Sequence, residues 1–302
     1  MKKFIKKLLF KIPPVKHLLE ELGKFKTFHP PGHFYSPVPD KEYVRKNAKR
    51  IFDRTKKDLP GIDLREHQQF ELIELFRVFY DEIYFTDEKI AANRYFYKNG
   101  LFSYADAIFL YSFICHFSPK RIIEVGSGFS SAVMLDTNEK KFNNSIDILL
   151  IEPFPVRLDK LIEGFPKHFR MVQGFVQDIP LDTFQNLEKD DILFIDSTHV
   201  SKAGSDVNYI LFEILPVLKE GVIIHFHDVF YPFEYPEEWI EKGYAWNEDY
   251  ILRSFLMYNK NFEITFFNTY MIQFYDKWFA ENMPDVLKNS GGSLWLKKIK
   301  CD

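Results

Sequence analysis

The sequence predicts an α/β fold: a doubly wound, mostly parallel sheet that ends in an antiparallel hairpin, with a helical cap at its N-terminal side. Two observations support this fold class. Short apolar runs alternate with segments of helical periodicity from about residue 100 onward, as expected for successive β–α units. Two later apolar runs are joined by too few residues to contain a crossover helix, so they can pair only as antiparallel neighbours.

The alternation also predicts the bounds of the individual elements. Strands are expected at 121–126, 146–153, 169–174, 191–197 and 221–229. Helices are expected at about 130–141, 156–164, 202–218 and 247–260. The closing hairpin is expected from Phe262–Asn268 and Tyr270–Tyr275, which meet at Asn268-Thr269.

Four regions are expected along the chain. Residues 1–40 hold a basic amphipathic helix and a proline-rich connector, and residues 41–100 show the apolar spacing of two or three helices that form a cap. The main domain is expected at 101–276. The remaining residues, 277–302, are expected to form a C-terminal tail with a hinge at Gly291-Gly292.

Composition narrows the class of protein. The chain has 302 residues, of which 46% are hydrophobic and 27% charged, as in ordinary globular proteins. A net charge of −3 gives no reason to expect a nucleic-acid partner. Two cysteines without partners at metal-binding spacing, and no apolar stretch long enough to span a membrane, predict a cytoplasmic protein. The basic N-terminus could contact an anionic membrane surface, and an oligomer is also compatible with the sequence.

The segment Arg121–Ser131, read as RIIEVGSGFSS, combines a short apolar run, a glycine-containing turn and the start of a helix. Glycines allow a sharp turn and the close approach of a ligand. The helix start that follows offers free N–H groups. This order predicts a nucleotide-type cofactor site.

Polar residues follow the other predicted strands. Because ligands of open parallel sheets bind beyond the carboxyl ends of the strands, these residues are the functional candidates. A carboxylate at the end of the second strand can accept hydrogen bonds from ribose hydroxyls, and the next connection could contact an adenine edge. The candidates are Glu152, the pair Gln177-Asp178, Asp196, His199, His227 and Asp228.

The order of these motifs resembles the class I S-adenosylmethionine-dependent methyltransferase family, which has a Rossmann-like fold. The resemblance consists of EVGSG, Glu152, FIDSTH and the closing hairpin, and it covers about residues 100–276. Within the family, FIDSTH, LPVLKEGV and HDVF are similar to the small O-methyltransferase-like group. We therefore expect O-methylation of a small hydroxylated acceptor, such as a sugar or a secondary metabolite.

The resemblance also implies roles for individual residues. Glu124 and the loop Gly126-Ser127-Gly128 would border the methionine part of S-adenosylmethionine, Glu152 would hold its ribose, and Asp178 would lie at the adenine end. Asp196 and Asp228 match carboxylates that bind magnesium in metal-dependent relatives. Val229 departs from those relatives, which often have Asp or Asn at this position, so the ligand set of a divalent metal stays open.

Methyl transfer to a hydroxyl needs an aligned nucleophile and a group that lowers or takes its proton. Asp196, His199 and His227 are the candidate catalytic residues, because an unperturbed imidazole titrates near pH 6.5. His225 lies deeper on the same strand face as His227, and we interpret it as a hydrogen-bonded core residue. The aromatic run Phe230–Trp239 could form a lid or a packed loop.

Three other functions are compatible with parts of the pattern. A nicotinamide-dependent oxidoreductase usually carries GxGxxG, but Ser131 stands at the third glycine position. A metal-dependent hydrolase or oxygenase could use His225, His227 and Asp228. A non-catalytic binding module would keep the fold without the chemistry.

Overall fold

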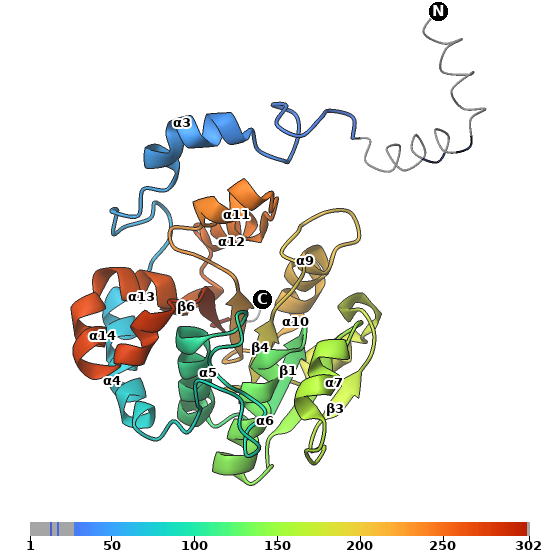
Figure 1. Ribbon diagram of the computed structural model, residues 1–302, viewed down its shortest axis with the longest axis vertical. Coiled ribbons are helices and arrows are strands. Elements are labelled where there is room, and N and C mark those ends of the chain that lie inside the picture. Colours follow the sequence, from blue (N-terminus) through green and yellow to red (C-terminus); the bar gives the residue numbers. More distant parts are fainter. Residues whose placement is uncertain (1–12, 14–16, 18–26, 301–302) are drawn as a thin grey trace, which may run out of the picture. The chain divides into compact units, whose positions relative to one another are not determined.

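The computed structural model describes residues 13, 17 and 27–300 (Figure 1). The basic helix predicted for the N-terminus lies almost entirely outside these residues. Contacts divide the chain into two compact units. One comprises Met1–Phe52 and Glu237–Ala245, and the other comprises Asp53–Pro236 and Trp246–Asp302. These units do not follow the expected boundaries at residues 40 and 100.

The larger unit is built on a seven-stranded sheet of order β3-β2-β1-β4-β5-β7-β6. The first five strands of this order are parallel, whereas β7 is antiparallel to both β5 and β6. This arrangement confirms the predicted doubly wound α/β class. The strands are β1 (Arg121–Val125), β2 (Asp147–Ile151), β3 (Arg170–Val172), β4 (Ile192–Ile195), β5 (Ile223–His227), β6 (Phe262–Phe267) and β7 (Ser293–Lys298).

The prediction of the closing hairpin is correct for its first strand and wrong for its second. Tyr270–Tyr275 does not form a strand, because most of it belongs to helix α13 (Asn268–Phe274), and the antiparallel partner β7 comes from the expected C-terminal tail. A short apolar run has no periodicity that separates a strand from a buried helical turn. Asn268 connects the two elements, since its Oδ1 accepts hydrogen bonds from the backbone N–H groups of Thr269 and Ser293, both at 2.7 Å.

The central strands are apolar on both faces. All four residues of β4 are fully buried, and its neighbours β1 and β5 are almost as inaccessible. Helices that cover both faces of a parallel sheet require such sequences. The exceptions, Glu124 in β1 and His225 and His227 in β5, are buried polar groups that need a specific environment.

Helices pack on both sides of this sheet (Figure 1). Because parallel crossovers are right-handed, the helices before and after the reversal of strand order between β1 and β4 lie on opposite faces. Neighbours in one layer are α4 (Glu66–Tyr80), α5 (Tyr104–Phe117), α6 (Phe129–Phe142) and α7 (Val156–Ile162). The connections from β3 to β5 contain η1 (Val176–Asp178), α8 (Leu181–Gln185), α9 (Asp206–Tyr209), η2 (Ile210–Ile214) and α10 (Leu215–Val217).

Three further helical segments follow: α12 (Glu248–Leu256), α14 (Asp276–Asn282) and η3 (Pro284–Lys288). Part of the expected cap belongs to the main unit, since α4 packs against α5 and β6. The side chain of Gln69 in α4 is fully buried and accepts a 2.7 Å hydrogen bond from the backbone N–H of Phe267. None of the helices between residues 27 and 300 has the length and apolar character needed to cross a bilayer.

The smaller unit pairs α3 (Lys41–Ile51) with α11 (Glu237–Lys242). Asp40 caps α3 by accepting the backbone N–H groups of Glu42 and Tyr43. Glu241 joins the two helices: its carboxylate accepts from Arg45, with Nε at 2.8 Å, and its carbonyl accepts from Lys41 Nζ at 2.6 Å.

Candidate functional site

The glycine turn after β1 lies against the end of β4. Gly126 has φ +82°, and a Cβ at this position would lie 2.0 Å from the carbonyl oxygen of Asp196. Any other residue would force the two strand ends apart. Gly126 is therefore required by both its backbone conformation and this contact.

Glu124, predicted to border the cofactor, is fully buried and does not line either of the two pockets described below. Its carboxyl accepts hydrogen bonds from Ser130 Oγ at 2.6 Å and from Ser131 Oγ, in the first turn of α6. Burial raises the pKa of Glu124 to about 8, although the serine hydrogen bonds oppose this shift. The contacts assign Glu124 to holding the glycine turn against α6.

A first pocket of about 390 Å³ opens beyond the ends of β1, β2 and β4. Glu152 lies in its wall, and both of its carboxylate oxygens accept backbone hydrogen bonds: Oε2 from Ser127 at 3.0 Å and Oε1 from Phe154 at 2.7 Å. Each oxygen keeps a further lone pair for a ligand. Glu152 thus joins the glycine turn to the loop after β2. Its carboxylate is held in the pocket wall, where the predicted contact with a ribose would have to form.

The structure places the two adjacent adenine-end candidates, Gln177 and Asp178, differently. Asp178 is exposed and does not line the first pocket, whereas Gln177 does. Gln177 Nε2 donates to the carbonyl of Gly204 at 3.0 Å. Its Oε1 is buried and has no hydrogen-bond partner within the described part of the chain. A buried acceptor without a partner is uncommon, and a turn of the amide toward the pocket would let it accept from a ligand amine.

A second pocket, of about 270 Å³, adjoins the first. The two pockets share the segment Asp196-Ser197-Thr198. Gly128 and Arg157 also line the second pocket, together with the apolar side chains of Leu101, Phe102, Phe129 and Trp246. His199, His227 and Asp228 complete its polar wall, so the structure brings together the predicted catalytic and metal candidates.

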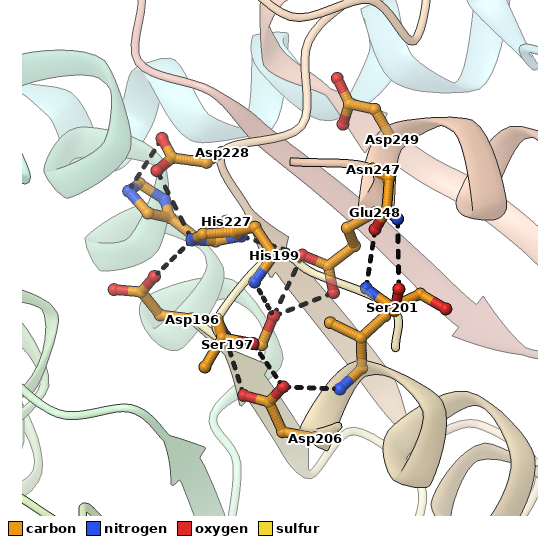
Figure 2. Close-up of polar contacts among 12 residues, drawn as sticks. Asp196, Ser197, His199, Ser201, Asp206, His227, Asp228, Asn247, Glu248 and Asp249 are labelled. Atoms are coloured by element: carbon orange, nitrogen blue, oxygen red, sulfur yellow. Dashed lines mark hydrogen bonds and ion pairs between the residues drawn. The ribbon is translucent and has the colours of Figure 1, made fainter. Parts of the chain in front are cut away.

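Glu248 holds His199 in this wall. Its Oε2 lies 2.9 Å from His199 Nδ1, and both its oxygens accept from Ser197 Oγ at 3.1 Å (Figure 2). The carbonyl of His199 accepts the backbone N–H groups of Asn247 and Glu248 at the start of α12. His199 and Asp228 both have positive φ, at 59° and 54°. Non-glycine residues in this region are uncommon and concentrate at functional sites.

The carboxylates around the histidines shift their pKa values. Burial alone would lower the pKa of His199, but Asp196 and Glu248 outweigh it and raise the pKa well above its usual value. Burial also lowers the pKa of His227, but the charges of Asp228 and Asp196 outweigh burial, so the net pKa of His227 is raised. The direction of the pKa shift of His199 favours its protonated form, which donates hydrogen bonds, whereas the base role expected from an unperturbed imidazole needs the neutral form and stays a prediction.

The two aspartates differ. Burial would raise the pKa of Asp196, but the charge of His227 and the contact with His199 lower it below the usual value. Burial raises the pKa of Asp228. His199 Nε2 lies between them, 3.4 Å from Asp196 Oδ1 and 3.7 Å from Asp228 Oδ2. His227 Nε2 lies 3.6 Å from Asp228 Oδ1.

These contacts are ion pairs when the imidazole rings are protonated, the form that their raised pKa values favour. Among the described residues, no group of three or more His, Cys, Asp or Glu side chains is arranged to hold a metal ion. The space between the two predicted magnesium ligands, Asp196 and Asp228, is taken by His199 Nε2. This arrangement does not fit a bound metal, and metal ligation by Asp196 and Asp228 stays a prediction from the sequence.

Two neighbouring features do not contribute to the pockets. His225 is a core residue, as expected: its ring stacks on Phe194 at 3.8 Å, and burial lowers its pKa well below the usual value. Its Nδ1 has no hydrogen-bond partner in the described structure, but the ring makes a hydrogen bond with the backbone of Ile195, in agreement with the hydrogen-bonded core residue expected. The aromatic run after β5 forms a packed loop, with Tyr231, Phe233 and Tyr235 buried and none of them lining either pocket.

Sequence reasoning did not single out Glu248 or Arg157, and it did not separate Gln177 from its neighbour Asp178. Glu248 follows Asn247 in the first turn of α12, where an acidic residue is normally explained by the helix dipole and exposed to solvent. Nothing in the sequence distinguishes it from Asp249, whose side chain points away from His199 (Figure 2). The pairing with His199 depends on tertiary structure alone.

Comparisons with known proteins identify a domain within this chain. Residues 123–229 match a family model described as a methyltransferase domain. An uncharacterized protein of Archaeoglobus fulgidus is 39% identical over 174 residues, which cover 56% of this chain and 76% of that protein.

Two solved structures are more distant. The methyltransferase PaMTH1 of Podospora anserina, solved with bound S-adenosylhomocysteine (SAH), is 16% identical with a TM-score of 0.43, and the match covers 84% of this chain and 96% of that one. A putative methyltransferase of Thermobifida fusca is 11% identical with a TM-score of 0.38, covering 91% and 100%.

The sheet order, the glycine turn and the matched domain define a cofactor-dependent transferase. The chain contains a methyltransferase domain, and its sheet has the Rossmann-like order of the S-adenosylmethionine-dependent methyltransferases. This assignment favours methyl transfer over the oxidoreductase, hydrolase and binding-module alternatives.

Proposed function

We propose that this methyltransferase methylates a hydroxyl oxygen of a small acceptor that binds in the second pocket. The observation that carries the proposal is the shared wall Asp196-Ser197-Thr198. It separates a cofactor-sized pocket from a smaller one that holds several titratable side chains. Methyl transfer is an in-line displacement, so the acceptor oxygen must reach the methyl group directly, and the place where the two pockets adjoin is where donor and acceptor can meet.

The residues of the first pocket fit S-adenosylmethionine. Gly126 lines this pocket without a side chain, Glu152 has lone pairs suited to ribose hydroxyls, and the unpaired Oε1 of Gln177 can accept from the adenine amine once its amide turns toward the pocket. When bound, the cofactor supplies a methyl group activated by its sulfonium. The chain itself must orient the acceptor and take its proton.

Asp228 is the residue that we assign to proton removal. A carboxylate whose pKa is raised by burial is a stronger base than an ordinary aspartate, and Asp228 lines the second pocket. His199 is fixed by Glu248 and places a charged N–H between Asp196 and Asp228. It can donate to the acceptor oxygen and fix its direction, while Asp228 accepts the hydroxyl proton. No step of this proposal uses a metal ion.

Titration calorimetry with SAH, with NAD as the control, tests the cofactor. We expect binding of SAH alone, both with and without EDTA. Mass spectrometry of reactions with S-adenosylmethionine and matched pairs of hydroxyl and amine acceptors then tests the acceptor atom. Methylation of the hydroxyl member supports the proposal, and methylation of the amine member alone would overturn it.

A further inference from the structure

The wall of the second pocket contains a cation that the proposed chemistry does not use. Arg157, in the first turn of α7, lines this pocket and also an adjoining hollow of about 520 Å³. Its side chain runs along the glycine turn: a Cβ on Gly128 would lie 3.4 Å from Arg157 Cδ and 3.6 Å from Nη1. The guanidinium therefore lies at the rim of the pocket in which the acceptor is proposed to bind.

Arg157 differs from other arginines of the same unit. Arg65 pairs with Glu263 at 2.6 Å, Arg94 with Asp136 at 2.9 Å, and Arg170 with Asp147 at 2.8 Å. Arg157 has no hydrogen bond or ion pair within residues 27–300. A guanidinium presents a planar fork of donors that matches a carboxylate.

The surroundings of Arg157 increase its positive potential. Lys160 lies three residues further along α7, hence on the same face, and lines the adjoining hollow without an ion-pair partner in the described structure. The acidic residue in the wall of that hollow, Glu152, already accepts two backbone hydrogen bonds. The charge of Arg157 also helps to lower the pKa of Asp196. Arg157 is therefore close enough to influence the segment that the two pockets share.

The rest of the pocket favours a flat ligand of limited size. Phe102, Phe129 and Trp246 supply aromatic surfaces. Its volume of about 270 Å³ is at or just below the lower end for small-molecule sites, which is roughly 300 Å³. A single ring with one or two substituents is the kind of molecule that this space admits.

We propose that the acceptor carries a carboxylate in addition to its hydroxyl and that Arg157 binds this carboxylate. This inference rests on the proposed function, since it assumes that the acceptor enters the second pocket. The competing occupant is the carboxylate of the cofactor itself. The experiment must therefore be done with the cofactor site filled.

The test compares para-hydroxybenzoate with the neutral para-hydroxybenzyl alcohol as probes of protein saturated with SAH, using NMR or calorimetric titration. We expect the wild-type protein to bind the acid about tenfold or more tightly than the alcohol. Arg157→Gln should abolish this preference, Arg157→Lys should keep part of it, and Arg77→Gln on the exposed face of α4 should not change it.

Three results would overturn the inference: equal affinity for the two probes, binding of neither, or a preference that survives in Arg157→Gln. A loss of SAH affinity in Arg157→Gln with no change in probe preference would assign the arginine to the cofactor instead. Because the readout is binding, failure of the inference differs from failure of the proposed O-methylation, which the acceptor-pair reactions measure.

Discussion

The carboxylate of Glu248 lies 2.9 Å from Nδ1 of His199, and both side chains are almost completely buried. This pair joins the start of α12 to the loop after β4, two segments about fifty residues apart in the chain. It fixes which ring nitrogen faces the second pocket, because Nδ1 is occupied and Nε2 is directed toward Asp196 and Asp228. The orientation of the His199 ring is therefore fixed by Glu248, a residue that does not itself line the pocket.

Glu248→Gln should lower the pKa of His199. The substitution keeps the size of the side chain but removes a charge that raises this pKa. NMR titration of histidine-labelled protein measures the effect without any substrate, and turnover should fall together with the protonated fraction. Glu220→Gln, on an exposed residue, is the matched control. An unchanged His199 titration would contradict the positioning role of Glu248.

Glu152→Ala should weaken SAH binding by about 1.5–3 kcal/mol, because charge-assisted hydrogen bonds to the ribose are lost. Titration calorimetry measures this change, and circular dichroism checks that the two backbone hydrogen bonds of Glu152 are not needed for folding. Affinity equal to that of the wild-type protein would refute the ribose assignment.

Gln177→Ala should weaken SAH binding more than Asp178→Asn does. Gln177 lines the first pocket with a free acceptor oxygen, whereas Asp178 is exposed and lies outside it. The same calorimetric titration compares the two variants under identical conditions. The opposite order would restore Asp178 as the adenine-end residue, as the sequence resemblance implies.

The contrast between these two residues shows what sequence can predict here. Gly126 and Glu152 were predictable because a strand end fixes where they lie and parallel strand ends meet at one edge of the sheet. Gln177 and Asp178 are adjacent in the short helix η1, and only its rotation decides which one faces the pocket. Sequence periodicity over three residues cannot determine that rotation.

The last strands show the same limit at larger scale. The antiparallel end of the sheet was predicted, but its strand β7 lies well beyond the expected hairpin. Asp106 in α5 explains the pairing in part: it accepts from the backbone N–H of Gly292 at 3.1 Å and from Ser293 Oγ at 2.6 Å, where β7 begins. Such contacts join residues nearly two hundred positions apart, so local pattern does not reveal them.

Asp196→Asn should keep the fold and the affinity for SAH but abolish turnover, because Asp196 forms the boundary between the two pockets and pairs with His199. Thermal unfolding and calorimetry provide the controls. A variant that unfolds would indicate a structural role instead.

Chelation should leave turnover intact, because His199 Nε2 lies between the two carboxylates that would bind a metal. The measurement is the initial rate after dialysis against EDTA, compared with the rate after adding back Mg²⁺. Loss of activity that Mg²⁺ restores would contradict this expectation and would return Asp196 and Asp228 to the role of metal ligands.

Glu124→Gln should change how stability depends on pH. Burial raises the pKa of Glu124 to about 8, so between its ordinary value and about pH 8 the folded state keeps a proton that the unfolded state has released. Stability attributable to this group therefore falls as pH rises through that window, by at most about 1.4 kcal/mol per pH unit. Glutamine resembles the protonated carboxyl but cannot titrate. Urea unfolding at pH 5.5 and pH 8 should show the variant gaining stability relative to the wild-type protein at the higher pH, and a pH-independent difference would show that Glu124 is already ionised in the folded state.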